Sequence, residues 1–360
     1  MPAERLPPVP RRLDAIDGLR GIAALAVFFF HLNVAPLAAA GWLASGWHAV
    51  WRYGHLGVPL FFVLSGVCIG RTWLRGAGAK EFLWHRLRRI FPAYWGSLIV
   101  TLLLAGAVKL ATGVNDVAMV PTSAGTILAT LSLATAPVTT VPPMSWVYWS
   151  LSYALAFYAV MAGLLLAFPG RRAAALACAH VGLCALAMVP SGWPSPAGFW
   201  VDLWPLFGTG AAIALWPTHR RLVPVMLAAS GAHAVVALAQ HRPQAYWAVA
   251  LVGAVSAAWA LHRGRPAWPR VLVRIGERSY SIYLLHSALG VYVFNKLIPS
   301  FGAFAALEIL RQLLIVALTV VTVRPFFAAL ERPFLRRAAP PAGNAASALG
   351  RGLEPAANQP

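Results

Sequence analysis

The sequence predicts an all-α protein that crosses a membrane about ten times. Apolar residues make up 59% of the 360 residues and charged residues only 11%, against about 25% charged in a typical soluble protein. These charges are too few to cover a water-soluble body of this size. The apolar residues also fall in runs long enough to cross a bilayer, which takes about 20 residues per helix. We therefore expect a polytopic membrane protein.

Ten apolar runs are the candidate membrane helices. In chain order they are residues 18–38, 55–73, 91–111, 146–168, 173–190, 198–216, 222–240, 245–262, 279–298 and 305–327. The longest segment between them, 112–145, is rich in Thr, Ser and Pro but holds a weakly apolar stretch at 127–134. That stretch is too short to span, so we expect an interfacial or re-entrant helix there.

The positive charges predict the orientation of these helices. Lys and Arg total 29 against 10 Asp and Glu, a net charge of +19. Most of them lie before the first run, in every second gap and after the last run, where the segments 71–89 and 270–278 are the richest. Cytoplasmic loops carry such an excess, so both termini are expected to be cytoplasmic and the protein to lie in the inner (plasma) membrane. Nucleic-acid binding is not expected, because the basic residues do not form a polar surface.

A single transmembrane domain is expected over residues 13–335. Residues 1–12 would form a cytoplasmic N-terminal segment, and residues 336–360, rich in Ala, Pro, Gly and Asn, a disordered cytoplasmic tail. The first apolar run imitates a signal peptide. Asp17, Arg20 and His31 in or beside this run favour a retained helix, since an inert leader would not need them.

Arg20 and His31 are the most informative pair in the chain. Eleven helical residues return to within roughly 20° of the starting direction and rise about 16 Å. One helix face would therefore carry a guanidinium, suited to phosphate, and an imidazole, suited to acid–base chemistry. A structural interpretation remains open, in which Arg20 reaches the membrane surface and pairs with Asp17.

Arg86 and Arg89 form a second candidate phosphate site. They stand three residues apart at the expected start of a helix and so share one face. Other residues are expected to be structural: Phe62 in the core, Glu331 in an ion pair with Arg332, and Trp146 in an interfacial aromatic belt.

Five segments, in order, resemble the acyltransferase-3 family of integral-membrane acyltransferases. The first is Asp17-Gly18-Leu19-Arg20-Gly21 with the Arg-x10-His spacing that follows. The others are the segments 57–66 (GVPLFFVLSG), 86–95 (RLRRIFPAYW), 275–286 (IGERSYSIYLLH) and 331–334 (ERPF). The resemblance covers about residues 13–335, nearly the whole chain.

The resemblance implies an O-acyltransferase. Such a protein moves an acyl group, here expected to be acetyl, from cytoplasmic acyl-CoA to a hydroxyl of a cell-envelope or exported glycan or glycolipid. Acyl-CoA would be a co-substrate, with no permanently bound cofactor and no metal. We expect His31 to be the reactive group and Arg20, Arg86 and Arg89 to bind the CoA phosphates. The candidate substrate contacts are Asp17, Tyr158, Ser279, Tyr280 and His286.

One position departs from the family. The segment 149–158 (WSLSYALAFY) follows its fourth-helix motif closely, but the family normally has Glu where Ala154 stands. We count Ala154 as a catalytic position and expect it on the acceptor side, where a carboxylate could orient the acceptor hydroxyl or hold the His31 tautomer. The chain with Ala154 is expected to bind acyl-CoA but to transfer poorly.

Two routes and two other functions stay open at this point. His31 could take the proton of the acceptor hydroxyl, or could itself carry the acyl group. A transporter or glycan exporter could use His31 and Asp17 as a proton relay, although no internal repeat of the transporter kind is evident. The change at Ala154 also allows a non-catalytic membrane partner.

Overall fold

A computed structural model describes residues 14–34, 37, 41–74, 78–113, 117–189, 199–240 and 268–335. Within these ranges the chain is helical and contains no strand, as the sequence predicts. The expected helix at 245–262 and the expected terminal segments 1–12 and 336–360 lie outside the described residues.

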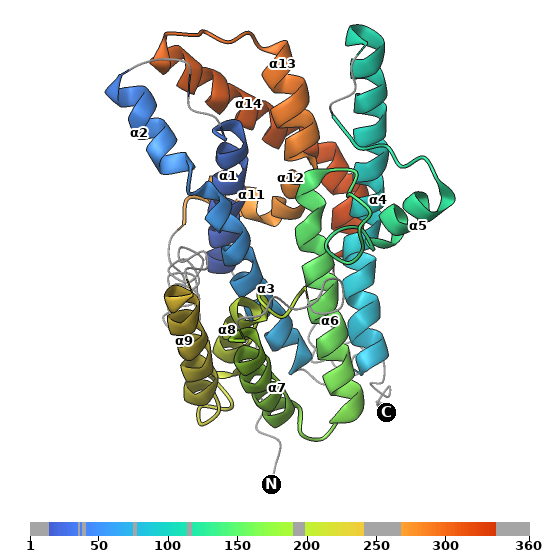
Figure 1. Cartoon of the computed structure of the whole chain (residues 1–360), viewed down its shortest axis with the longest axis vertical. Coiled ribbons are helices and arrows are strands. Elements are labelled where there is room, and N and C mark those ends of the chain that lie inside the picture. Colours follow the sequence, from blue (N-terminus) through green and yellow to red (C-terminus); the bar gives the residue numbers. More distant parts are fainter. Residues whose placement is uncertain are drawn as a thin grey trace, which may run out of the picture.

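Most of the helices follow the predicted apolar runs, whereas those at Trp42–Trp51 and Arg270–Glu277 lie between them (Figure 1). They are α1 (Asp14–Leu32), α2 (Trp42–Trp51), α3 (Gly57–Trp73), α4 (Ala79–Thr112), α5 (Ala124–Ser132), α6 (Trp149–Ala167), α7 (Arg172–Ala187), α8 (Trp204–Leu215), α9 (Val223–Ala239), α11 (Arg270–Glu277), α12 (Ser279–Leu285), α13 (Asn295–Leu297) and α14 (Ala305–Phe326). Two π-helical segments, η3 (His286–Phe294) and η4 (Phe327–Glu331), follow α12 and α14.

Five helical segments are long and apolar enough to cross a membrane. They are Asp14–Leu32, Trp42–Trp73, Ala79–Thr112, Trp146–Ala167 and Ala305–Phe334. Three shorter apolar helices, α7, α8 and α9, have 10–17 residues each. The multi-pass helical architecture is thus confirmed, while the count of ten spans and the direction of the termini stay predictions.

Two differences from the sequence-based boundaries are informative. The basic segment 86–89 lies inside α4, which has 34 residues and begins at Ala79, so Arg86 and Arg89 are held on a rigid helix. The stretch at 127–134 does form a short helix, α5, whose first turn is closed by a capping box between Ser123 and Thr126.

Helix α1 lies at the centre of one half of the molecule. It packs against α3, α11, α12 and α14, which come from both ends of the chain (Figure 1). The apolar core has two large clusters, beside a small third one of Ala105, Val117 and Ala288. One joins α1 to α4, α12 and α14, and the other joins α3 and α6 to α7 and α8.

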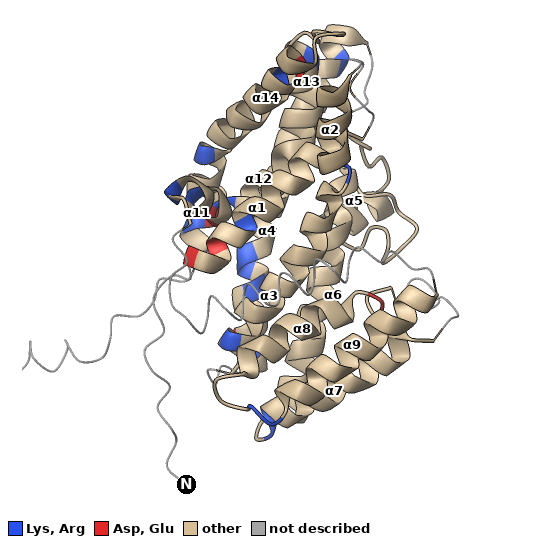
Figure 2. Ribbon diagram, turned by 90° about the vertical axis from the view of Figure 1, so that its left-hand side faces the viewer, with Lys and Arg blue, Asp and Glu red and all other residues tan. Residues whose placement is uncertain are grey.

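The basic residues gather on one side of the molecule. In Figure 2, Lys and Arg cluster around α11 and the adjacent part of α4, while the opposite edge of the helical body is almost uncharged. This asymmetry is consistent with the uneven charge that the sequence predicts for the two membrane faces.

Glycines allow a close helix contact between α3 and α8. A Cβ atom on Gly210 would collide with the backbone carbonyl of Val63, and one on Gly66 with the carbonyl of Phe207. Small residues at such a crossing let two backbones approach, as is common between membrane helices.

We predict that Gly210→Ala lowers the thermal unfolding midpoint of the detergent-solubilised protein. The added methyl group has to push the α3 backbone away, and such overpacking costs about 1–3 kcal/mol. The control is Gly231→Ala in α9, where a Cβ meets nothing within 4 Å. Alanine there should be neutral or stabilising, since it is the better helix former. Equal midpoints for the two variants would contradict the close packing of α3 and α8.

Candidate functional site

Helix α1 carries both candidate residues toward two adjacent cavities. Asp14 and Asp17 lie in its first turn, where acidic groups favour a helix N-terminus. Arg20 faces the first cavity and His31, near the other end of the helix, faces the second. Arg20 and His31 therefore line neighbouring cavities, and their action on one substrate stays a prediction.

We call the first cavity the arginine pocket. It encloses about 130 Å³ and is lined by the three arginines predicted to bind phosphate, Arg20, Arg86 and Arg89. None of its lining residues, all within the described ranges, is an acid. Its other polar lining residues are Ser65, Ser150, Tyr158, Ser279, Tyr280 and Tyr283. The arrangement suits an anionic ligand, because guanidinium groups bind phosphate oxygens in a planar fork.

The polar groups beside these arginines were predicted as substrate contacts. Ser279 is fully buried, and its hydroxyl is without a hydrogen-bond partner among the described residues. The Tyr280 hydroxyl donates to the carbonyl of Ile90, at 3.0 Å. Asp17 lies 3.9 Å from Arg20, as the pairing interpretation expects.

Glu331 was expected to pair with Arg332, and the structure corrects this. Its carboxylate is fully buried and accepts hydrogen bonds from the backbone N–H of Ser281, at 3.1 Å, and from the Ser281 hydroxyl, at 2.6 Å. Glu331 therefore holds the start of α12, where Ser279 and Tyr280 line the arginine pocket.

We call the second cavity the histidine pocket. It encloses about 120 Å³ and is lined by His31 and His55, by Phe30, and by Trp146 and Trp149. Trp146 meets the His31 ring edge to face, with ring centroids 4.1 Å apart. Trp146 is therefore part of the site, whereas the sequence indicated only an interfacial belt.

A thin septum separates the two pockets. Val58, Phe62 and Tyr283 line both of them. Phe62, expected in the core, is indeed buried, but it also forms part of this wall. The Tyr283 hydroxyl donates to the carbonyl of Val147, at 2.7 Å, and also contacts the Ser150 hydroxyl, at 2.7 Å. These bonds hold the ring in the septum.

His286 lies against His31 rather than in a pocket wall. His31 Nδ1 lies 2.8 Å from His286 Nε2, and the two rings stack with an interplanar angle of 17°. His286 Nδ1 lies 2.8 Å from the backbone carbonyl of Tyr283. Residue 286 opens the π-helical segment η3, and π-helical turns occur often at functional sites.

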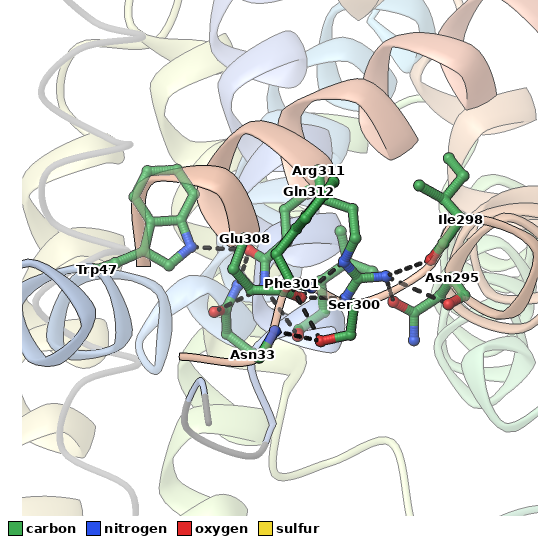
Figure 3. Close-up of polar contacts among 11 residues, drawn as sticks. Asn33, Trp47, Asn295, Ile298, Ser300, Phe301, Glu308, Arg311 and Gln312 are labelled. Atoms are coloured by element: carbon green, nitrogen blue, oxygen red, sulfur yellow. Dashed lines mark hydrogen bonds and ion pairs between the residues drawn. The ribbon is translucent and has the colours of Figure 1, made fainter. Parts of the chain in front are cut away.

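A buried polar network fixes the end of α1 that carries His31 (Figure 3). The Gln312 side-chain oxygen accepts hydrogen bonds from Asn33 Nδ2 and Trp47 Nε1, each at 2.8 Å. One turn earlier on α14, Glu308 forms an ion pair with Arg311. Arg311 in turn donates to the side-chain oxygen of Asn295, at 2.9 Å. This network ties α1 and α2 to α14 and to the segment after η3.

Ala154 lines the arginine pocket and not the histidine pocket. The sequence predicts the acceptor side for this position, where a carboxylate could orient the acceptor hydroxyl or hold the His31 tautomer. The observed partner of His31 is His286 instead. A carboxylate at position 154 would face Arg20, Arg86 and Arg89.

The described part of the chain holds no group of three or more His, Cys, Asp or Glu side chains that could bind a metal ion. Sequence reasoning missed Tyr283, Trp146 and Glu331 as parts of the site. Tyr283 and Glu331 lie inside the recognised segments, but nothing in a linear pattern reveals which residues they meet.

Comparisons with known proteins give a consistent result. Residues 13–324 match the family described as an acyltransferase domain. The chain is 32% identical over 97 residues to a peptidoglycan O-acetyltransferase of Listeria monocytogenes. The aligned segment covers 25% of this chain and 13% of the relative. It is 34% identical over 106 residues to a putative O-acetyltransferase of Staphylococcus aureus. Here the aligned segment covers 28% of this chain and 15% of the relative. The matched segments thus span only a small part of these longer proteins. No solved structure matches the chain.

Proposed function

Because the chain belongs to the acyltransferase family that its residues 13–324 match, we propose that it is a membrane-embedded, acyl-CoA-dependent O-acyltransferase. It moves an acetyl group from cytoplasmic acetyl-CoA to a hydroxyl of a cell-envelope or exported glycan or glycolipid. Its location is the inner (plasma) membrane. The observation that carries the proposal is the meeting of an arginine pocket and a histidine pocket at one septum.

The arginine pocket supplies the donor site. Arg20, Arg86 and Arg89 converge on it from α1 and α4. The phosphates of CoA bind to these guanidinium groups, and the pantetheine arm leads the thioester toward Phe62 and Tyr283. CoA is a co-substrate in this scheme, so no cofactor stays bound between turnovers.

The histidine pocket supplies the reacting group and the acceptor site. His31 takes the proton of the acceptor hydroxyl while the hydroxyl oxygen forms a bond to the thioester carbonyl carbon. The carbon–sulfur bond then breaks, and the proton on His31 passes to the CoA thiolate. In the alternative route, His31 first accepts the acyl group and then transfers it.

The chemical class of the acceptor is inferred from the aromatic side chains that line the histidine pocket and from the names of the related proteins. Trp146, Trp149 and Phe30 present rings beside His31, and such faces suit the apolar side of a sugar. The matched Listeria protein is named a peptidoglycan O-acetyltransferase. A glycan hydroxyl is therefore the acceptor we propose.

A second function, that of a non-catalytic membrane partner, is favoured by one observation. Ala154 leaves the arginine pocket without the carboxylate that the family motif has at this position. The two functions differ in one measurement, because a non-catalytic partner would bind acetyl-CoA without consuming it.

We predict that His31→Ala abolishes acetyl transfer while the protein stays folded. The change removes the only proposed proton acceptor, and losing a general base slows a reaction by about 100-fold or more. The measurement is CoA release from acetyl-CoA by the purified full chain with envelope glycans. The control is His219→Ala, outside both pockets. If His31→Ala kept most of the activity, His31 could not be the proton acceptor.

We predict that Arg20→Ala and Arg86→Ala weaken acetyl-CoA binding more than they slow the saturated reaction. Anchoring of phosphates contributes equally to the ground state and the transition state. The dissociation constant for acetyl-CoA and kcat are measured separately, with the exposed Arg220→Ala as control. A fall in kcat with unchanged acetyl-CoA affinity would contradict the anchoring role.

We predict that Ala154→Glu raises turnover by about tenfold or more, which corresponds to about 1.4 kcal/mol of barrier. The new carboxylate restores the family motif and faces three arginines. The matched control is Ala154→Gln, which has nearly the same size but no charge. Equal rates for the parent protein and the Glu variant would show that position 154 is structural.

A further inference from the structure

Two hydrogen bonds connect His31 to a backbone carbonyl through a second histidine. The first joins His31 Nδ1 to His286 Nε2, and the second joins His286 Nδ1 to the carbonyl oxygen of Tyr283, both at 2.8 Å. No second hydrogen bond of His31 occurs within the described residues. Its other ring nitrogen, Nε2, is therefore the one left for chemistry.

The positions of the protons follow from the carbonyl at the end of this chain. A carbonyl oxygen only accepts, so His286 Nδ1 must carry a hydrogen. A neutral imidazole has one N–H, so His286 Nε2 presents a lone pair. That lone pair requires a donor, which is His31 Nδ1. His31 Nε2 is then unprotonated and ready to accept a proton.

A cationic His286 would reverse this assignment. With both nitrogens protonated, His286 would donate to His31 Nδ1 and leave the hydrogen of His31 on Nε2, where it blocks proton uptake. The surroundings disfavour that state. His286 is only 1% exposed, and neither histidine forms an ion pair with any carboxylate in the described ranges. A charge buried without a partner is strongly unfavourable.

Packing holds the rings of His31 and His286 in the relative position that this hydrogen bond needs. The π-helical segment η3 begins at His286 and presents its ring beside the end of α1. Phe28 covers His286, with ring centroids 5.4 Å apart, and Trp146 covers His31. The Gln312–Asn33 hydrogen bonds fix the turn of α1 that follows His31.

We propose that His286 is a positioning residue that holds His31 in the tautomer with a free Nε2. It takes the place that a carboxylate has in a Ser-His-Asp triad. When His31 accepts the proton of the hydroxyl, its Nδ1–H becomes part of a cation, and the bond to His286 becomes a stronger, charge-assisted one. The carbonyl of Tyr283 orients His286 in turn. The inference rests on the proposed role of His31.

The first test reads the tautomer without any activity measurement. The full chain, labelled with ¹⁵N-histidine and solubilised in detergent, is studied by NMR, and His31 is assigned from its absence in His31→Gln. We expect the spectrum of neutral His31 with hydrogen on Nδ1. A His31 that carries its hydrogen mainly on Nε2 would overturn the proposal.

The second test separates positioning from folding. His286→Phe keeps the ring but removes the acceptor, and we expect kcat to fall by about 100-fold with the acetyl-CoA dissociation constant unchanged. His286→Gln keeps a carbonyl oxygen that can accept from His31, and its kcat should stay within about tenfold of the parent. The control is His180→Phe, because His180 is also fully buried and hydrogen-bonded to a backbone carbonyl, that of Met226, but lies outside both pockets.

The outcomes distinguish this proposal from the proposed function. Full activity in His286→Phe, or equal losses in the Phe and Gln variants, would contradict the positioning role. If His286→Phe does not fold, the NMR spectrum of the parent protein and the kcat of His286→Gln still test the positioning role of His286. Activity retained in His31→Ala together with the expected tautomer would contradict the proposed function and leave the hydrogen-bonded chain intact.

Discussion

Most buried polar groups that organise this apolar bundle find their hydrogen-bond partners on the protein itself. Water is scarce at such depth, and an unmet donor or acceptor costs several kcal/mol. This constraint pairs Asn33 with Gln312 and Glu308 with Arg311, and it seats Glu331 on the first turn of α12. The Asn33–Gln312 bond joins the end of α1 to α14, whereas Glu308 and Arg311 lie one turn apart on α14 itself. The same requirement therefore helps to fix the end of α1 that carries His31.

The two pockets follow from that placement. Helix α1 brings Arg20 to one and His31 to the other, while α3 supplies Val58 and Phe62 to the wall between them. Tyr283 completes the wall and is held by hydrogen bonds to the α6 region. In the proposed function, donor recognition and proton transfer take place on opposite sides of a barrier only a few side chains thick.

Apolar runs and charge spacing predicted much of this structure. They located α1, α3, α4, α6 and α14, because a membrane helix has a strong compositional signal. Helical geometry placed Arg86 and Arg89 on one face, and the structure shows both in the arginine pocket. Contacts between distant segments could not be predicted in this way. His31 and His286 are separated by 255 residues, and Glu331 meets Ser281 rather than its neighbour Arg332, because tertiary packing decides these partners.

The septum of Val58, Phe62 and Tyr283 also bears on ion permeability. A protein with polar cavities opening toward both faces of an energised membrane would dissipate the proton gradient if a continuous column of water joined them. Among the described residues, the side chains that line both pockets are two hydrophobic ones and a tyrosine whose hydroxyl is already bonded to Val147, which disfavours such a column. In the proposed function, an acyl group attached to a flexible arm would need only a brief displacement of these rings, whereas protons would need an uninterrupted chain of waters. The same wall would then let the acyl group pass and hinder the flow of protons.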